Sequence, residues 1–409
     1  MSKLANYRAR RRAGVVLPLA AVAALAAGGL STALAKGASY EVLYNFAAPP
    51  YDGALPVAGV IDVNGTLYGT TEVGGIYAGD GSGGTMFSVD PTTGAETLLH
   101  SFGSGLDGNY PGASVIDVKG TLYGTTVAGG ANGYTGTVFS VDPTTGVETV
   151  LHSFPSSATD GIYPVASLID VNGTLYGTTE RGGAYGDGMV FSVDPKTTPE
   201  TVLHSFGSGT DGEYSFAGLI DVGGTLYGTT EKGGTYGDGT VFSVNPTTGA
   251  ETVVYSFCSQ RNCTDGESPV ASLIDVNGAL YGTTGGGGTG DGTVFSVNLT
   301  TGAETVLYSF GSTTYPYASL IDVKGMLYGA TEVGGTSTSC GFGFGCGAVF
   351  SVDPTTGAEK VVYSFCGQQN CTDGEHPRAS LIDVKGTLYG ITEGGGANDD
   401  GTVFALMKP

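Results

Sequence analysis

The sequence predicts an all-β protein: a seven-bladed β-propeller made of four-stranded antiparallel blades. Three observations support this fold class. A unit of about 53 residues recurs seven times, and each unit holds four short runs rich in β-branched and aromatic residues. In addition, the two ends of the repeat region carry complementary fragments of one unit, which is the arrangement expected of a closed ring.

The repeat is marked by the tripeptide Leu-Tyr-Gly, at intervals of 47 to 61 residues. It precedes a V-F-S-V run and follows an A-[SG]-[LV]-I-D-V run, and each unit ends in E-T-V-L-[HY]-S-F or a near copy. We name the four runs a ("ASLIDV"), b ("TLYGTT"), c ("TVFSV") and d ("ETVLHSF"). The tripeptides are centred on Tyr68, Tyr123, Tyr176, Tyr227, Tyr281, Tyr328 and Tyr389.

The links between the runs are hairpin signals. Asn64-Gly65, between a and b, is typical of a type I′ turn. Between c and d lies "DPTTGA", in which the proline presets φ and Gly94 suits a left-handed position. The runs are apolar throughout, as in strands covered on both faces, and no helical periodicity follows residue 35.

The phase of the repeat distinguishes a ring from an open β-solenoid stack. After residue 35 the chain begins with "YEVLYNF", which matches d, and it ends with "VFALM", which matches c. Pairing of residues 41–46 with residues 403–407 would complete the last blade and remove an exposed edge. An open stack has no reason to divide its repeat in this way, so we expect the ring.

The first 35 residues predict a secretory signal peptide, followed by one domain over 36–409. A basic stretch precedes an apolar run of about 18 residues, and "STALA" supplies small residues for cleavage after Ala35. An uncleaved membrane anchor is the alternative, and Arg11-Arg12 is a weak twin-arginine signal. We therefore expect a secreted or periplasmic bacterial protein with no membrane span after cleavage.

The charge balance excludes one class of partner. Cleavage would remove five positive charges and take the formal net charge from −22 to −27. Nucleic-acid binding requires basic surface, so a nucleic-acid partner is not expected. An acidic surface favours solubility, and we expect a monomer.

The repeat wording "LIDVNGTLYGTTE…GDGTVFSVDPTTGAETVLHSF" resembles the bacterial GloVer tandem repeat of secreted choice-of-anchor proteins, over nearly the whole chain after residue 35. The resemblance implies a repeat fold and export, and no reaction. Family members often carry a C-terminal sorting signal; none follows the last repeat strand here, so the resemblance does not extend to a surface anchor. The double glycine after run b is also similar to kelch repeats, but the chain has no tryptophan.

All six cysteines fall in b–c or d–a links, in pairs that are close in sequence. An even number of cysteines in an exported protein favours disulfides, and local pairing is the simplest of fifteen connectivities. A metal site is the alternative. The expected bridges are Cys258–Cys263, Cys340–Cys346 and Cys366–Cys371.

The b–c and d–a links vary while the a–b and c–d links are nearly constant, so we expect any binding site on the b–c/d–a face. Run b leads into a glutamate in five units, which predicts a broken acidic ring that could hold a cation. The plainer explanation is a solvated carboxylate for the glutamates and an ordinary Asp-Gly turn for the aspartates of the "GDG" links. If either set binds an ion, calcium is the cofactor to test. The glutamates are Glu72, Glu180, Glu231, Glu332 and Glu393, and the "GDG" links offer Asp80, Asp187, Asp238 and Asp291.

Tyrosines on the same face are candidate sugar contacts, because a flat ring covers apolar sugar faces; the alternative is that each tyrosine packs against its own loop. They include Tyr77, Tyr185 and Tyr236. His100, His152 and His204 alternate with tyrosines at one position of run d, which indicates aromatic packing rather than catalysis.

No catalytic motif is present. The sequence therefore predicts an exported binding or structural module with an extracellular glycan or protein as partner. The alternative is a glycan- or polymer-active enzyme that uses carboxylates on the same face.

Overall fold

The computed structural model describes residues 39–47, 49–78, 83–132, 134–155, 159–197, 200–312, 314–337, 339–340 and 344–408. The chain divides into two units, Met1–Lys36 and Gly37–Pro409, and the described residues all lie in the second. The predicted signal peptide lies outside the described residues. Among the described residues, no helix has the length and apolar character that a membrane span requires.

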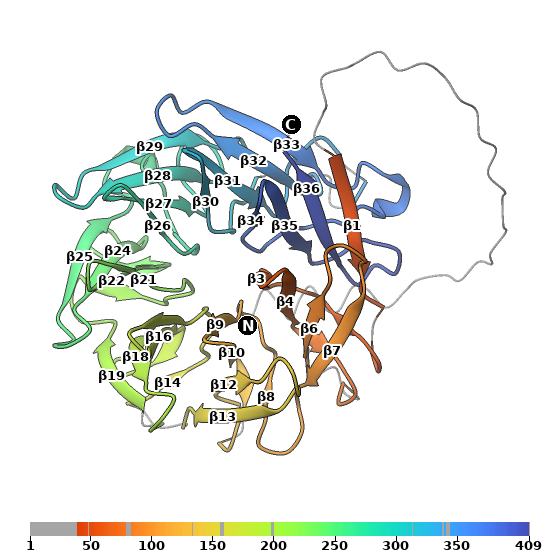
Figure 1. The fold of residues 1–409 in the computed structure, drawn as a ribbon. Helices are drawn as coiled ribbons and strands as arrows, with labels where there is room; N and C mark the ends of the chain where they lie inside the picture. The colour runs from red at the N-terminus through yellow and green to blue at the C-terminus, as the bar shows by residue number, and fades with distance from the viewer. Residues whose placement is uncertain are drawn as a thin grey trace, which may run out of the picture. The chain divides into compact units, whose positions relative to one another are not determined.

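The described residues form seven four-stranded antiparallel sheets arranged as a ring of blades (Figure 1), which confirms the predicted fold class. Runs a, b, c and d become the four strands of each blade, in that order from the centre outward. The innermost strands are β3 (Ile61–Val63), β9 (Ile116–Val118), β15 (Ile169–Val171), β21 (Ile220–Val222), β26 (Ile274–Val276), β30 (Ile321–Val323) and β34 (Ile382–Val384). The b strands are β4 (Thr66–Thr71), β10 (Thr121–Thr126), β16 (Thr174–Thr179), β22 (Thr225–Thr230), β27 (Ala279–Thr284), β31 (Met326–Thr331) and β35 (Thr387–Thr392).

The c strands carry the fully buried phenylalanine of each V-F-S-V run and are the most buried part of each blade. They are β6 (Thr85–Val89), β12 (Thr137–Val141), β18 (Met189–Val193), β24 (Thr240–Val244), β28 (Thr293–Asn298), β32 (Ala348–Val352) and β36 (Thr402–Met407). The outer d strands are β7 (Glu96–Ser101), β13 (Glu148–Ser153), β19 (Glu200–Ser205), β25 (Glu251–Ser256), β29 (Glu304–Ser309), β33 (Glu359–Ser364) and β1 (Ser39–Asn45).

The N-terminal strand closes the ring, as the split repeat predicts. Strand β1 pairs antiparallel with β36, from Ser39 opposite Met407 to Asn45 opposite Thr402. The seventh blade is therefore β34–β35–β36–β1, and the strand that its C-terminal end lacks comes from the other end of the repeat region. In Figure 1 the red β1 lies beside the blue β36.

Each interface between neighbouring blades, which we call a seam, contains an aromatic contact. The phenylalanine that follows a d strand meets the c-strand phenylalanine of the next blade, with ring centroids 4.9–5.3 Å apart and mostly edge-to-face. The closing seam has the same contact, Phe46 to Phe87 at 5.0 Å. Ring closure therefore uses the same packing as every internal seam.

Hydrogen bonds near the axis add a second tie across five seams. Thr178 Oγ1 in β16 donates to the carbonyl of Ala217, just before the next blade's inner strand, at 3.0 Å. The equivalent donors and acceptors are Thr70–Ala113, Thr125–Ala166, Thr229–Ala271 and Thr283–Ala318. Blades six and seven carry Ala330 and Ile391 at this position, which have no hydroxyl.

The constant a–b and c–d turns have structural explanations. Asp62 accepts a hydrogen bond from the Gly65 amide of its own turn at 3.0 Å, as the "IDV" aspartates are expected to do. Gly94, in the c–d turn, has φ of +69°, and a Cβ there would lie 2.5 Å from the Leu43 carbonyl oxygen of the neighbouring blade. These turns are therefore conformational and packing features.

Candidate functional site

The b–c and d–a loops lie on one face and are joined by short two-stranded ladders. Four such ladders occur in the described residues: β2 (Gly53–Ala54) with β5 (Val73–Gly74), β8 (Gly108–Asn109) with β11 (Ala128–Gly129), β14 (Gly161–Ile162) with β17 (Arg181–Gly182), and β20 (Gly212–Glu213) with β23 (Lys232–Gly233). In blades five and seven, single bridges do the same, Glu267 to Gly286 and Glu375 to Gly394. The variable loops thus rest on a repeated backbone frame.

A cavity of about 130 Å³ lies on the axis, where the segments entering the inner strands converge. Small side chains line it: alanine from six of the seven blades, and a serine or glycine from every blade. Serine hydroxyls face neighbouring amides, since Ser272 Oγ accepts from the Gly218 amide at 2.9 Å and Ser319 Oγ accepts from the Ser272 amide at 3.0 Å. The cavity is therefore a small, polar recess.

Each blade also contributes to the lining the residue two positions before this serine or glycine, on the side of the d–a loop, and we call these seven residues the rim. Most are apolar or aromatic, and one is basic, so the rim is the part of the cavity in which the blades differ most. In blade order they are Val57, Gly112, Val165, Phe216, Val270, Tyr317 and Arg378.

The predicted glutamates follow the b strands beside this rim. Their backbone amides are held by the preceding d–a loop: the Glu180 amide donates to the Tyr163 carbonyl at 3.0 Å, and the Glu231 amide donates to the Tyr214 carbonyl at 2.9 Å. The same bond fixes the amides of Glu72, Glu332 and Glu393. The five residues thus take equivalent places around the axis.

The gap in the glutamate ring at blade five is filled by an aromatic ring. Tyr317 lies so close to Gly285 that a Cβ there would be 3.0 Å from its ring. Tyr317 also stacks on Tyr315, with centroids 5.8 Å apart. Burial, followed by the nearby Glu332, raises the pKa of Tyr317 to about 12, so its hydroxyl remains a hydrogen-bond donor at neutral pH.

The sequence places a basic neighbour beside only two of these glutamates, but the structure supplies a third cation. Arg378 donates to Glu332 at 2.8 Å and to Glu393 at 3.3 Å, and so links blades six and seven. Burial alone would lower the pKa of Arg378; the charges of Glu393 and Glu332 outweigh it and raise the pKa. The distance along the chain between Arg378 and Glu332 explains why sequence inspection misses this pair.

The two basic residues that directly follow a ring glutamate, Arg181 and Lys232, have different ion-pair partners. Arg181 does meet Glu180, at 3.3 Å, and its guanidinium lies 4.0 Å from the centre of the Tyr214 ring. Lys232 instead pairs with Asp238 at 3.2 Å rather than with its neighbour Glu231. The acidic ring is thus compensated on the sides of Arg181 and Arg378.

The b–c loop tyrosines lie further out and are open to solvent. Tyr77, Tyr185 and Tyr236 are 44%, 58% and 53% exposed. Each sits at the tip of its own b–c loop in a different blade. They could contact an extended ligand on this face.

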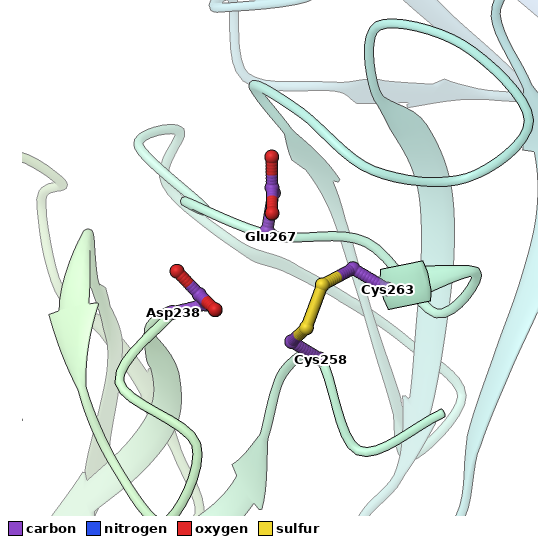
Figure 2. A group of neighbouring side chains, drawn as sticks. All are labelled: Asp238, Cys258, Cys263 and Glu267. Carbon is purple, nitrogen blue, oxygen red and sulfur yellow. A yellow bond between two sulfur atoms is a disulfide. The ribbon is translucent and has the colours of Figure 1, made fainter. Parts of the chain in front are cut away.

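The four "GDG" aspartates come from four different blades, and the structure does not gather the three described ones into one site. Asp80 lies outside the described residues. Asp238 is grouped with Glu267 and the Cys258–Cys263 pair (Figure 2), but that sulfur pair is a disulfide and Lys232 already contacts Asp238. Asp187 accepts a hydrogen bond from Tyr214. Calcium binding at these turns stays a prediction.

The structure joins the cysteines as Cys258–Cys263, Cys340–Cys346 and Cys366–Cys371, with no free cysteine. Two of the bridges close single 3₁₀ turns, η1 (Arg261–Cys263) and η2 (Gln369–Cys371), that follow outer strands. The predicted local pairing is confirmed. The bridges stiffen loops of the variable face.

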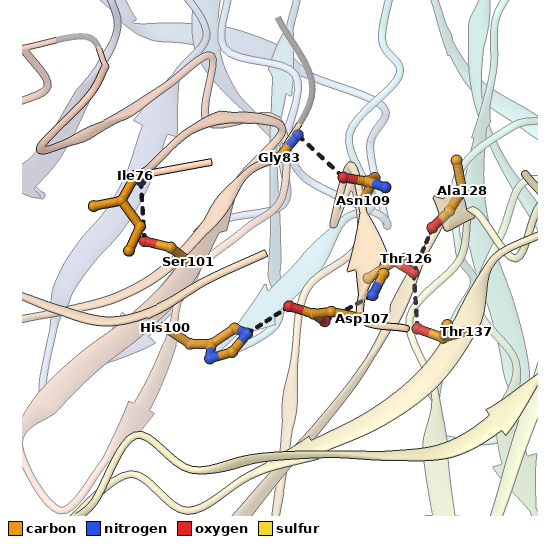
Figure 3. A network of polar contacts seen from close by, with 10 residues as sticks. Ile76, Gly83, His100, Ser101, Asp107, Asn109, Thr126, Ala128 and Thr137 are labelled. Carbon is orange, nitrogen blue, oxygen red and sulfur yellow. Dashed lines mark hydrogen bonds and ion pairs between the residues drawn. The ribbon is translucent and has the colours of Figure 1, made fainter. Parts of the chain in front are cut away.

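The histidines pack as predicted: the His100 ring contacts Phe102 edge-on at 4.7 Å. The structure adds a role that sequence inspection missed. His100 Nε2 meets Asp107 Oδ2 of the following d–a loop at 2.9 Å (Figure 3), while in other blades a tyrosine donates to the same aspartate, as Tyr255 does to Asp265 at 2.7 Å. At five of the seven seams the aspartate of the d–a loop thus bonds the histidine or tyrosine of the preceding outer strand.

These features define a propeller with a small polar axial recess and an acidic, partly aromatic rim. The chain belongs to the Gloeobacter/Verrucomicrobia repeat family, whose model matches residues 25–235, 136–344 and 185–404. A search of curated proteins finds no match.

Solved structures with this architecture are distant in sequence. An oligogalacturonate lyase in complex with manganese shares 14% identity with a TM-score of 0.56, over 92% of this chain and 94% of that one. An oligogalacturonate lyase from Vibrio parahaemolyticus shares 10% with a TM-score of 0.51, over 91% and 98%. The extracellular domain of a putative one-component system from B. thetaiotaomicron shares 16% with a TM-score of 0.55, over 90% and 42%. At these identities the likeness concerns the fold alone.

Proposed function

We propose that this chain is an exported binding module that takes its ligand at the rim of the axial recess on the b–c/d–a face. Export rests on the predicted signal peptide at residues 1–35 and is compatible with the three disulfides, which persist in oxidising compartments. The observation that carries the proposal is the rim itself: a fixed frame on which the blades present different side chains. Rigid scaffolds with varied loops are typical of binding sites.

The chemistry of the rim favours a neutral or amine-bearing ligand with an apolar face, such as a sugar. Phe216 and Tyr317 offer aromatic surface, and the Tyr317 hydroxyl is a donor. Glu231 and its equivalents attract amines and accept hydrogen bonds from hydroxyls. The acidic ring and the formal net charge of −22 disfavour anions.

A glycan-active enzyme is the second candidate, favoured by the pair Glu332 and Glu393 that Arg378 brings together. A paired-carboxylate mechanism also needs an acid with a raised pKa. The half-buried glutamates with pKa values raised to about 7 or 8 lie at the start of outer strands, among them Glu96 and Glu304. The fold likeness to oligogalacturonate lyases does not transfer their substrate, because the acidic rim would repel a polyanion.

The test is a glycan array together with a hydrolysis and lyase screen on the purified chain. Binding of neutral or amine-bearing glycans without turnover supports the binding module, and product formation supports the enzyme. No binding to any array member contradicts the proposed ligand class.

Thermal unfolding with calcium against a chelator, and with simple amines, tests whether the ring holds a cation. It is run on the native chain and on Glu180→Gln with Glu231→Gln. A ligand that binds the folded state alone raises the melting temperature. A calcium shift that survives both substitutions would place the ion away from the ring.

A further inference from the structure

A cluster of three titratable side chains lies at the outer part of the seams. It consists of the histidine or tyrosine near the end of one d strand, the aspartate of the following d–a loop, and the glutamate that begins the next blade's d strand. Among the described residues, the ligand atoms of His100, Asp107 and Glu148 all lie within 4.8 Å of one another, and so do those of His152, Asp160 and Glu200.

The second of these clusters lacks the histidine–aspartate hydrogen bond that the other two histidine seams have. We call a seam closed where this bond is formed and open where it is not. His100 and His204 contact their aspartates directly, at 2.9 and 2.8 Å. His152 Nε2 and Asp160 Oδ2 are instead 4.0 Å apart. The sequence gives a reason: the aspartate follows the histidine by eight residues here and by seven at the other two seams.

Two atoms of the open cluster lack partners. Within the described residues, the buried atoms His152 Nε2 and Glu200 Oε1 have no hydrogen-bond partner. The glutamate oxygen is unpartnered at other seams too, as for Glu96 and Glu304, where a tyrosine satisfies the aspartate. Only at the His152 seam do an unpartnered imidazole nitrogen and an unpartnered carboxylate oxygen share one cluster, and burying such atoms is costly.

The pKa shifts in this cluster are those expected where a bound cation would be stabilising. Burial lowers the pKa of His152, and Asp160 only partly opposes this, so the imidazole is neutral at pH 7 with a lone pair to donate. Burial, followed by the nearby Asp160, raises the pKa of Glu200 to about 7. Two half-buried carboxylates beside a neutral imidazole are stabilised by a cation between them.

We propose that His152, Asp160 and Glu200 bind one zinc-like divalent metal ion in the seam between the second and third blades. One imidazole nitrogen and two carboxylate oxygens are a common zinc donor set, and water would complete a tetrahedron. Tetrahedral zinc holds its ligand atoms roughly 3.4 Å apart. The 4.0 Å between His152 and Asp160 would have to shorten by about 0.6 Å. The pairs at the other two seams, at 2.9 and 2.8 Å, would have to lengthen by about as much and would lose a hydrogen bond, which the His152 seam does not have to lose.

The seam supplies its own control substitutions. Tyrosine occurs naturally at the His152 position in four blades, for example as Tyr44 and Tyr255, which donate to the loop aspartate. His152→Tyr therefore removes a metal ligand while keeping a ring that the fold accepts. His204→Tyr makes the same change at a closed seam, and Glu200→Gln removes a second ligand without touching the aromatic position.

The experiment uses the full chain without a polyhistidine tag, stripped of metal with a chelator and dialysed. Bound zinc is measured by equilibrium dialysis with elemental analysis, and cobalt is substituted as a probe whose visible absorption reports tetrahedral coordination. The native chain should bind one equivalent of zinc that His152→Tyr loses and His204→Tyr retains, while Glu200→Gln should weaken binding about tenfold or more.

Native protein that binds no zinc would overturn the site. So would a zinc equivalent kept by both His152→Tyr and Glu200→Gln, or one lost equally in His204→Tyr. If His152→Tyr does not fold, Glu200→Gln alone decides. A site at the rim would respond to Glu231→Gln instead, so failure here leaves the proposed binding function untouched.

Discussion

Truncating Phe46 tests how the ring is closed. Phe46 is fully buried and packs against both blades of the closing seam, on Ile391 and Val403 from one side and Phe87 from the other. Removing a buried phenylalanine side chain costs about 3–5 kcal/mol, so Phe46→Ala should lower the urea midpoint clearly. A single free energy of unfolding is not assumed for seven repeats, and the midpoint is the quantity compared.

The matched control is Phe102→Ala, which removes the same contact at an internal seam. Phe102 is also fully buried and meets Phe139 at 4.9 Å, against 5.0 Å for Phe46 and Phe87. Its strand β7 is held by the preceding c–d turn, whereas β1 is joined to the ring's chain only at its C-terminal end. We therefore expect similar midpoint losses but different local opening.

Amide hydrogen exchange separates the two outcomes. In Phe46→Ala the amides of β1 should exchange at urea concentrations where the rest of the protein is still protected, and in Phe102→Ala those of β7 should not. Native protection of β1 together with an unchanged midpoint in Phe46→Ala would refute the closure argument.

Three further predictions concern the seams and loops. Burial raises the pKa of Glu304 to about 8, so the folded state keeps a proton that the unfolded chain releases above about pH 4.5. The stability of the fold should therefore fall from pH 5 to pH 8, by at most about 1.4 kcal/mol per pH unit for each such glutamate and by less after solvent screening. Glu304→Gln should flatten the plot of urea midpoint against pH, and a flat plot for the native chain would contradict this. Thr178→Val loses the bond to the Ala217 carbonyl, an interaction of about 1–2 kcal/mol, and should lower the urea midpoint; an unchanged midpoint would show that this bond is not stabilising. Replacing Cys366 and Cys371 by serine should cost about 2 kcal/mol, measured by thermal unfolding, and an unchanged curve would argue against the bridge.

The fold was predictable because the same strand and turn signals recur in all seven repeats. The hairpin turns, the apolar runs and the split unit each point to a closed ring, and the pairing of β1 with β36 follows from matching "YEVLYNF" to run d. Local disulfides were predictable for the same reason, since each pair lies within one loop.

The site was only partly predictable, because its chemistry depends on contacts between blades. The glutamate positions follow from the repeat, but the pairing of Arg378 with Glu332 and Glu393 joins residues from successive blades. One signal was available: Arg378 is the single charged residue at a position that is otherwise apolar, aromatic or glycine. The difference between the His152 and His204 seams depends on one extra loop residue, whose consequence appears only in three dimensions.

The most direct test of the proposed function is to compare ligand binding between the two faces of the ring. The affinity of the native chain for its strongest glycan-array ligand is set against that of Phe216→Ala with Tyr317→Ala, at the rim. The control is Val147→Ala, an exposed residue of a c–d turn on the opposite face. We expect the rim variant to lose about tenfold or more in affinity, since aromatic anchors carry much of a site's binding energy, and the control to keep the native affinity. Equal affinity in all three proteins, or a loss confined to Val147→Ala, would contradict a binding site at the rim.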